Sequence, residues 1–367
     1  MGELLEVPQG RLRHGYTTGA CATACAKGAL LALIHQRPVD EVTIWIPAGQ
    51  WVTFALKDVA FGAAEATAAT VKDGGDDPDA THGATIVATV SWRAEPGVEI
   101  DGGEGVGRVT KPGLPVPVGE AAINPVPRRM ILEACEEVLQ AHGIQRGVRV
   151  VVSVPGGEEI AKKTMNGRLG IVGGISILGT RGIVVPFSTA SYKASIALAL
   201  QVAREQGLRT VVMTTGGRSE KYGMRMYPEL PAEAFIEMGD FVGFSAKHAK
   251  RTGMAEIRFV GMMGKFSKVA QGVMMVHAKS APVDFHFLAR LAEEAGVPAA
   301  VCHDIRQANT ANQVGDMVLA AGCPAFFERL AQACCAQVLA HIGGGLRVVT
   351  RLVTLDGQEL GGACVDG

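Results

Sequence analysis

Two continuous apolar segments in the second half of the chain each run directly into a turn that contains glycine. Residues 209–213 lead into the turn from Thr214 to Gly217, and residues 256–260 lead into the turn from Gly261 to Lys265. Short apolar runs of this kind are typical of buried strands in parallel sheets. Ligands of open α/β sheets bind at the carboxyl ends of such strands. We therefore expect an α/β domain whose two strand-end turns form a ligand site.

Helices are expected to alternate with these strands over most of the second half. The helical patterns cover residues 188–206, 244–251, 266–277, 284–295, 308–320 and 325–341. Such alternation implies parallel βαβ units, so we expect a Rossmann-like α/β domain over residues 189–345. Residues 346–367 hold two further strand patterns that could return to the first domain.

The first half of the chain has more adjacent strands and fewer helices. Strand patterns cover residues 42–46, 51–56, 66–71, 84–92 and 148–154. An Ala-rich helix is expected at 21–35, with Thr17 or Thr18 as its cap, and a second helix is expected at 126–141, after Pro125. The pattern favours an α+β domain over residues 1–188, so the fold class is mixed α/β.

Charge and hydropathy restrict the kinds of partner. The 35 basic and 36 acidic residues leave a formal net charge of −1, which gives no field to recruit nucleic acid or an anionic membrane. Apolar runs are interrupted before the roughly 20 residues of a membrane helix. The first ten residues lack the pattern of a signal peptide. We expect a cytoplasmic protein that binds a small molecule, and the sequence allows a homo-oligomer.

Common catalytic and metal-binding motifs do not occur. The nine histidines are scattered, and HExxH, GxSxG and CxxC patterns are absent, so no metal site and no hydrolase triad is expected. Neither GxGxxG nor GxxxxGK[ST] follows the two strands. The glycine turns therefore have two interpretations: a nucleotide-type ligand site, or tight βα turns that need glycine for steric reasons alone.

Charged residues gather in irregular segments of the first half. Residues 72–83 hold four aspartates without EF-hand spacing, and residues 101–108 combine glycine with acidic side chains. Both loops suit capped turns as well as a ligand. Basic side chains in such segments suit a ligand with carboxylates, because guanidinium binds carboxylate through two hydrogen bonds, but ordinary surface charge is the alternative for each. The basic residues are Arg11, Arg13, Lys111, Arg128, Arg129, Lys162 and Lys163.

Several long segments of unusual composition resemble one known family. They are residues 15–19 (GYTTG), 72–83 (KDGGDDPDATHG), 109–120 (VTKPGLPVPVGE), 122–128 (AINPVPR), 166–179 (NGRLGIVGGISILG), 239–243 (GDFVG) and 261–265 (GMMGK). Together they are similar to the cobalt-precorrin-5B C1-methyltransferase family (CbiD) of anaerobic cobalamin biosynthesis. They span most of the chain from about residue 15 to 280, and the last roughly 80 residues match less distinctively.

The resemblance implies transfer of a methyl group from S-adenosylmethionine (SAM) to ring carbon C1 of cobalt-precorrin-5B, giving cobalt-precorrin-6A. Cobalt then belongs to the substrate. Displacement at an activated methyl group needs alignment and exclusion of water more than a dedicated nucleophile, and none is visible here. The acetate and propionate arms of the corrinoid would give the basic residues in loops a purpose.

These expectations assign three groups of candidate residues. SAM is expected against the strand-end turns, at Thr214, Thr215, Gly216, Gly217, Gly261 and Gly264. The corrinoid is expected between the two domains, in contact with Tyr16, Thr17, Thr18, Lys111, Arg128 and Arg129. Candidates for offsetting the sulfonium charge or accepting a proton are Asp76, Asp77 and Glu104.

Two other functions use some of the same features. A tetrapyrrole carrier without catalysis would use the basic loops but would not need the paired glycine turns. A nicotinamide-dependent corrinoid reductase would need a GxGxxG motif and an acidic residue about 20 residues beyond it, and the sequence pattern indicates neither.

Overall fold

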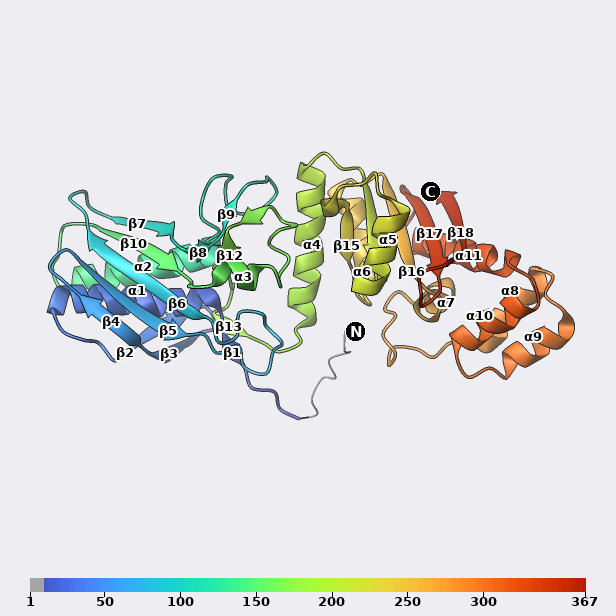
Figure 1. The fold of residues 1–367 in the computed structure, drawn as a ribbon, viewed down its shortest axis with the longest axis horizontal. Coiled ribbons are helices and arrows are strands. Elements are labelled where there is room, and N and C mark those ends of the chain that lie inside the picture. The colour runs from blue at the N-terminus through green and yellow to red at the C-terminus, as the bar shows by residue number, and fades with distance from the viewer. Residues whose placement is uncertain (1–9) are drawn as a thin grey trace. The chain divides into compact units, whose positions relative to one another are not determined.

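The structure, a computed structural model, describes residues 10–367. The expectation that no signal peptide is present falls almost wholly on residues 1–9, outside the described residues. The chain divides into two compact units, residues 1–188 and residues 189–367, which are described separately (Figure 1). Each unit contains helices and a five-stranded sheet, which confirms the mixed α/β fold class.

A five-stranded sheet and two long helices form the core of the first unit. The strand order is β4-β5-β6-β10-β7, in which β10 is parallel to β7 and antiparallel to β6. The strands are β4 (Lys57–Phe61), β5 (Glu65–Val71), β6 (Thr85–Trp92), β7 (Val98–Gly102) and β10 (Val148–Ser153). The helices α1 (Thr18–His35) and α2 (Pro125–Ala141) pack against each other, and α1 also packs on β5 and β6.

The Ala-rich sequence of α1 explains its central place. Small side chains let the helix approach both the sheet and α2, and Gly28 leaves room for the side chain of Leu56. By length and composition alone α1 could cross a membrane, but 78% of that segment is buried inside the first unit. A core helix accounts for its hydropathy.

Short strand pairs complete the first unit. They join β1 to β13, β8 to β12, β9 to β11, and β2 to β3. Their bounds are β1 (Gly15–Tyr16), β2 (Glu41–Ile46), β3 (Gln50–Ala55), β8 (Gly105–Val106), β9 (Arg108–Val109), β11 (Ile171–Val172), β12 (Gly174–Ile175) and β13 (Ile183–Val184). One short helix, α3 (Gly157–Ala161), follows β10. The strand patterns expected at residues 42–46 and 51–56 are confirmed as strands, and these two strands pair as β2 and β3.

The second unit contains an open sheet in the order β15-β14-β16-β17-β18. Its strands are β14 (Thr210–Thr214), β15 (Phe235–Glu237), β16 (Glu256–Met262), β17 (Arg347–Val353) and β18 (Glu359–Asp366). The first four are parallel, and β18 is antiparallel at one edge. This is the 2-1-3-4-5 order of doubly wound sheets, and not the 3-2-1-4-5-6 order of the dinucleotide fold.

The terminal strands do not return to the first unit. The apolar strand β17 pairs with β16, and β18 pairs with β17 through residues 359–366. Residues on both faces of β17 are buried. Such burial is typical of a strand inside a parallel sheet, and β17 lies inside the sheet of the second unit, between β16 and β18.

Helices surround this sheet. They are α4 (Thr189–Glu205), α5 (Gly217–Met226), α6 (Val242–Thr252), α7 (Met263–Ala270), α8 (Phe285–Glu294), α9 (Ala299–Arg306), α10 (Ala311–Ala320) and α11 (Ala325–Ile342), with a 3₁₀ turn at Ala232–Ala234. Helix α5 packs on the three strands β14, β15 and β16. The helix expected at 266–277 already ends at Ala270, because Gly272 adopts a positive φ of 85°.

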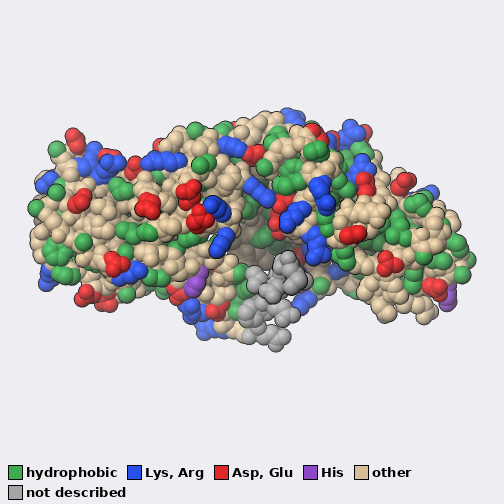
Figure 2. All heavy atoms as spheres, in the orientation of Figure 1, with side chains coloured by type: hydrophobic (Ala, Val, Ile, Leu, Met, Phe, Trp, Pro, Cys, Tyr) green, Lys and Arg blue, Asp and Glu red, His purple; other side chains and the backbone are tan. Residues whose placement is uncertain are grey.

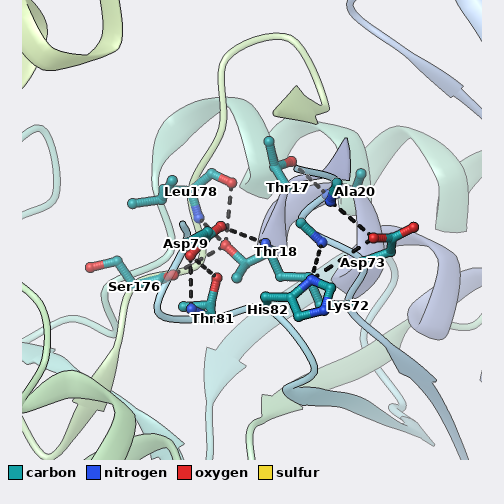
Figure 3. A network of polar contacts seen from close by, with 12 residues as sticks. Thr17, Thr18, Ala20, Lys72, Asp73, Asp79, Thr81, His82, Ser176 and Leu178 are labelled. Atoms are coloured by element: carbon teal, nitrogen blue, oxygen red, sulfur yellow. Dashed lines mark hydrogen bonds and ion pairs between the residues drawn. The ribbon is translucent and has the colours of Figure 1, made fainter. Parts of the chain in front are cut away.

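A buried ion pair holds the acidic loop of residues 72–83 in the first unit (Figure 3). The side chain of Lys72 is 1% exposed, and its Nζ donates to Asp79 at 2.6 Å. The other oxygen of Asp79 accepts from the backbone N–H and hydroxyl of Thr81. Burial by itself raises the pKa of Asp79, but Lys72 and Thr81 outweigh it, so the pKa of this carboxyl is lowered.

We expect Lys72→Met to destabilise the first unit by about 3 kcal/mol, because it leaves the partly buried Asp79 carboxylate without its cation. The difference should shrink below about pH 4, since a carboxyl whose folded pKa is lowered loses its stabilising contribution as it becomes protonated. All three tryptophans, Trp45, Trp51 and Trp92, belong to this unit, so urea unfolding followed by their fluorescence reports on it alone. Lys57→Met removes a far more exposed lysine and is the control. Equal midpoints for both variants would contradict the structural role of Lys72.

Candidate functional site

The carboxyl ends of β14 and β16 lie next to each other. Thr214 is the register partner of Val260, so the turns that follow the two strands begin at the same edge of the sheet. From β14 the chain passes through α5 to β15 on one side, and then crosses to β16 on the other side. This reversal is the topological switch point, where doubly wound sheets bind their ligands.

Polar contacts connect the two turns and the end of β15. Lys265 donates to the backbone carbonyl of Thr215 at 3.5 Å and forms an ion pair with Asp240 at 3.0 Å. The backbone N–H of Met238, directly after β15, donates to the carbonyl of Thr214 at 2.7 Å. Lys265 therefore has partners within the protein and is not an isolated surface lysine. Binding of an anion by Lys265 stays a prediction. The side chain of Lys265 links the second turn to residues of the first turn and of the segment after β15.

The glycines of these turns fall into two kinds. A Cβ atom added at Gly217 or Gly264 would meet nothing within 4 Å, and one at Gly216 would meet only Glu237, at 3.7 Å. None of these three has a backbone conformation that requires glycine. At Gly261, in contrast, a Cβ would lie 2.3 Å from the ring of Phe266. Packing therefore explains Gly261, while Gly216, Gly217 and Gly264 leave open space at the strand ends.

Thr214 carries a buried hydroxyl at the end of β14. The residue is 0% exposed, and its Oγ1 has no hydrogen-bond partner within residues 10–367. An unsatisfied buried polar atom costs about 1–3 kcal/mol. Ser219, the third residue of α5, in contrast accepts from the backbone N–H of Thr215 and donates to the carbonyl of Gly216. Hydrogen bonds from α5 thus hold the first turn in place, and they leave the hydroxyl of Thr214 without a partner among the described residues.

A cavity of about 270 Å³ opens beside the second turn. Met262 and Met263 line it from the end of β16, and Val353 and Thr354 line it from the end of β17. A larger cavity, of about 410 Å³, lies in the first unit between α1, α2 and β2, where Arg129 and Lys27 reach it. Size alone favours the larger cavity for a ligand. The smaller one lies between the ends of β16 and β17, beside the switch point, and none of the six predicted SAM residues lines it.

Two of the candidate catalytic acids hold backbone in the first unit. Asp76 accepts the N–H of Arg13 at 2.6 Å, and Asp77 accepts the N–H of Phe187 at 2.8 Å. Arg13 also donates to Asp73 through its side chain, which lowers the pKa of Asp73 to about 2. The carboxylate of Glu104 is exposed and makes no hydrogen bond or ion pair to the described residues. A catalytic role for the three candidates stays a prediction.

The candidate substrate residues before α1 are engaged in the same unit (Figure 3). Thr17 caps the helix by accepting from the N–H of Ala20. Thr18 accepts from the N–H of Leu178 at 2.9 Å, and its hydroxyl lies 3.2 Å from the carbonyl of Ser176. The ring of Tyr16 packs edge-on against another aromatic ring of this unit. Both threonine hydroxyls therefore serve the fold, and substrate contact by these residues stays a prediction.

The three basic candidates differ in what they contact. Arg128 donates to the carbonyl of Ile100 at 3.0 Å, and the aliphatic part of Lys111 lies against Gly170. Arg129 is 61% exposed, forms only a long contact of 3.8 Å with Glu133, and lines the cavity of the first unit. Arg129 therefore lies at the larger of the two cavities described here.

One acidic residue at the strand edge was missed from the sequence. Glu237 stands twenty residues after Gly217, at the end of β15, although no GxGxxG motif precedes it. The spacing was a usable signal, but β15 has only three residues and no periodicity that marks it as a strand.

Both charge signs are spread over the face in Figure 2. Within residues 10–367 no group of three or more His, Cys, Asp or Glu side chains could hold a metal ion.

Comparison with known proteins places the chain in a family. The sequence model described as CbiD matches residues 6–186, and the one described as CbiD, C-terminal domain, matches residues 275–364. A crystal structure of the cobalamin biosynthesis protein CbiD from Archaeoglobus fulgidus is 32% identical, with 70% of this chain and 79% of that chain covered and a TM-score of 0.39.

Curated relatives match over almost their whole length. A protein named cobalt-precorrin-5B C(1)-methyltransferase from Geobacillus kaustophilus (strain HTA426) is 68% identical over 97% of this chain and 96% of the relative. The protein of the same name from Priestia megaterium is 60% identical over the full length of both chains. Identity at this level over complete chains shows that this protein belongs to the CbiD family.

Proposed function

We propose that the protein transfers the methyl group of SAM to carbon C1 of cobalt-precorrin-5B, giving cobalt-precorrin-6A in cobalamin biosynthesis. The name shared by its relatives supports the reaction. The structural observation that supports it most is the pair of glycine turns at the switch point between β14 and β16. Such a site suits a nucleoside-type methyl donor.

The strand-end turns offer what such a donor needs. Helices α5 and α7 begin within the two turns, and their first N–H groups suit the carboxylate of the methionine part. Open space at Gly216, Gly217 and Gly264 lets the donor approach the backbone closely. The hydroxyl of Thr214, which has no hydrogen-bond partner among residues 10–367, is a further polar group at this edge.

Methyl transfer needs little further chemistry from the protein. The carbon–sulfur bond of the sulfonium breaks and its electron pair stays on sulfur, while an electron pair of the macrocycle at C1 forms the new bond to the methyl carbon. S-adenosylhomocysteine leaves as a neutral thioether. Catalysis then consists mainly of holding donor and acceptor in line and excluding water. Cobalt enters as part of the substrate.

The first unit is proposed to bind the carboxylate arms of the corrinoid. Arg129, exposed at its cavity, is the best-placed of the predicted contacts, and Lys27 lies on the same cavity wall. Both cations have glutamate neighbours, Glu133 and Glu137, that a substrate carboxylate would have to displace or bridge. We also infer that the protein acts in the cytoplasm without nucleic acid or membrane.

The carrier and the reductase are not favoured, because the relatives that match over the whole chain are named as methyltransferases. An anaerobic assay with cobalt-precorrin-5B and isotopically labelled SAM, read by mass spectrometry, tests the proposal. Product carrying one labelled methyl group at C1 supports it. Binding of the corrinoid without transfer of label would instead indicate a carrier.

We expect Gly264→Val to weaken binding of S-adenosylhomocysteine at least about tenfold, because the added side chain fills space that the donor needs. Its melting temperature should stay close to that of the wild type, since a Cβ added at Gly264 meets no atom within 4 Å. Isothermal titration measures the affinity. Ala255→Val, at an exposed position just before β16, is the control at the opposite edge of the sheet. Unchanged affinity in Gly264→Val would refute a donor site at the second turn.

The candidate acids can be separated by removing one charge at a time. We expect Asp77→Asn to keep kcat within a few-fold, because the amide oxygen still accepts the N–H of Phe187. If any of the three acids moves a proton, Glu104 is the one with an uncommitted carboxylate, so we expect Glu104→Gln to lower kcat about a hundredfold. Steady-state kinetics with both variants decides. A large loss in Asp77→Asn with normal stability would reverse the assignment.

A further inference from the structure

Glu237 lies at the first glycine turn. It is the last residue of β15 and the register partner of Thr214, the last residue of β14. Its Oε1 lies 3.7 Å from the point where a Cβ of Gly216 would be. A ligand that uses the open space at Gly216 would therefore lie beside this carboxylate.

Neighbouring groups hold the backbone of Glu237 in place and leave its side chain at the surface. The hydroxyl of Tyr192, from α4, lies 3.4 Å from the carbonyl oxygen of Glu237 and donates to it. The backbone N–H of the next residue, Met238, donates a hydrogen bond to the carbonyl of Thr214. The residue is exposed, so its carboxylate can reach a ligand. Two more acids lie near this edge: Asp240 forms an ion pair with Lys265, and Glu220 lies in the first turn of α5.

The chemistry of the carboxylate selects one part of the donor. A vicinal diol presents two O–H donors, and a carboxylate accepts both. In the dinucleotide-binding fold, whose strand order differs from that of this sheet, an acid about 20 residues after the glycine turn accepts from the ribose 2′-hydroxyl. Glu237 has this spacing from Gly217 and ends β15.

We propose that Glu237 binds the ribose hydroxyls of the methyl donor and thereby fixes the adenosyl group over the turn from Thr214 to Gly217. The inference rests on the proposed function, because it assumes that SAM is the donor. It assigns no chemical step to Glu237, which positions the donor and does not touch the transferred methyl group.

Titration with S-adenosylhomocysteine tests the assignment. Glu237→Gln keeps the size of the side chain but removes the charge, and we expect the affinity to fall about tenfold or more, the usual range for a hydrogen bond to a charged group. Glu205→Gln, at the exposed last residue of α4 and away from the strand ends, should bind like the wild type. Thermal melting of both variants checks that the fold is retained.

An analogue that lacks the 2′-hydroxyl separates ribose recognition from a general effect of charge. The wild type should prefer S-adenosylhomocysteine to its 2′-deoxy analogue about tenfold, and Glu237→Gln should lose most of that preference. If the wild type binds and Glu237→Gln keeps both the affinity and the preference, this inference fails and the proposed function stands. If the wild type binds neither compound, the proposed donor site fails as well.

Discussion

Parallel pairing between β14 and β16 is the constraint on which the candidate site depends. It places the ends of two strands that are far apart in sequence at one edge of the sheet. Because β15 lies on the other side of β14, the chain reverses its direction of winding there, and the helices that follow the strands leave the edge open. The glycine turns need no contact with each other to form a site. They need only to follow these two strands.

The first unit shows the opposite use of unusual residues. Its acidic loop, residues 72–83, and its Thr17–Thr18 pair were expected to bind ligands. Most of their polar atoms instead form hydrogen bonds or ion pairs within the unit. Lys72 and Asp79 close the loop, Asp76 and Asp77 accept backbone N–H groups, and Thr17 caps α1. A segment built from irregular backbone must satisfy its own donors and acceptors, and short acidic and hydroxyl side chains do this best.

Long periodic elements could be predicted from the sequence, and short ones could not. The helix α1 and the strands β14 and β16 have patterns long enough to identify. By contrast, β15 has three residues, and α5 begins at Gly217, directly after another glycine, and carries several charges. Because neither β15 nor α5 was predicted, the strand order could not be predicted, and the place of Glu237 at the end of a strand was not recognised. Hydrogen-bond partners across long sequence separations, such as Asp77 and Phe187, leave no local signal, so scaffold and site could not be told apart.

A crystal structure of the protein with bound S-adenosylhomocysteine measures the central claim most directly. The account predicts density for the whole ligand at the carboxyl ends of β14 and β16, with the backbone of Gly216, Gly217 and Gly264 in van der Waals contact with it. Density elsewhere in the molecule, with both turns unoccupied and unchanged, would contradict the account and leave the reaction supported by family membership alone.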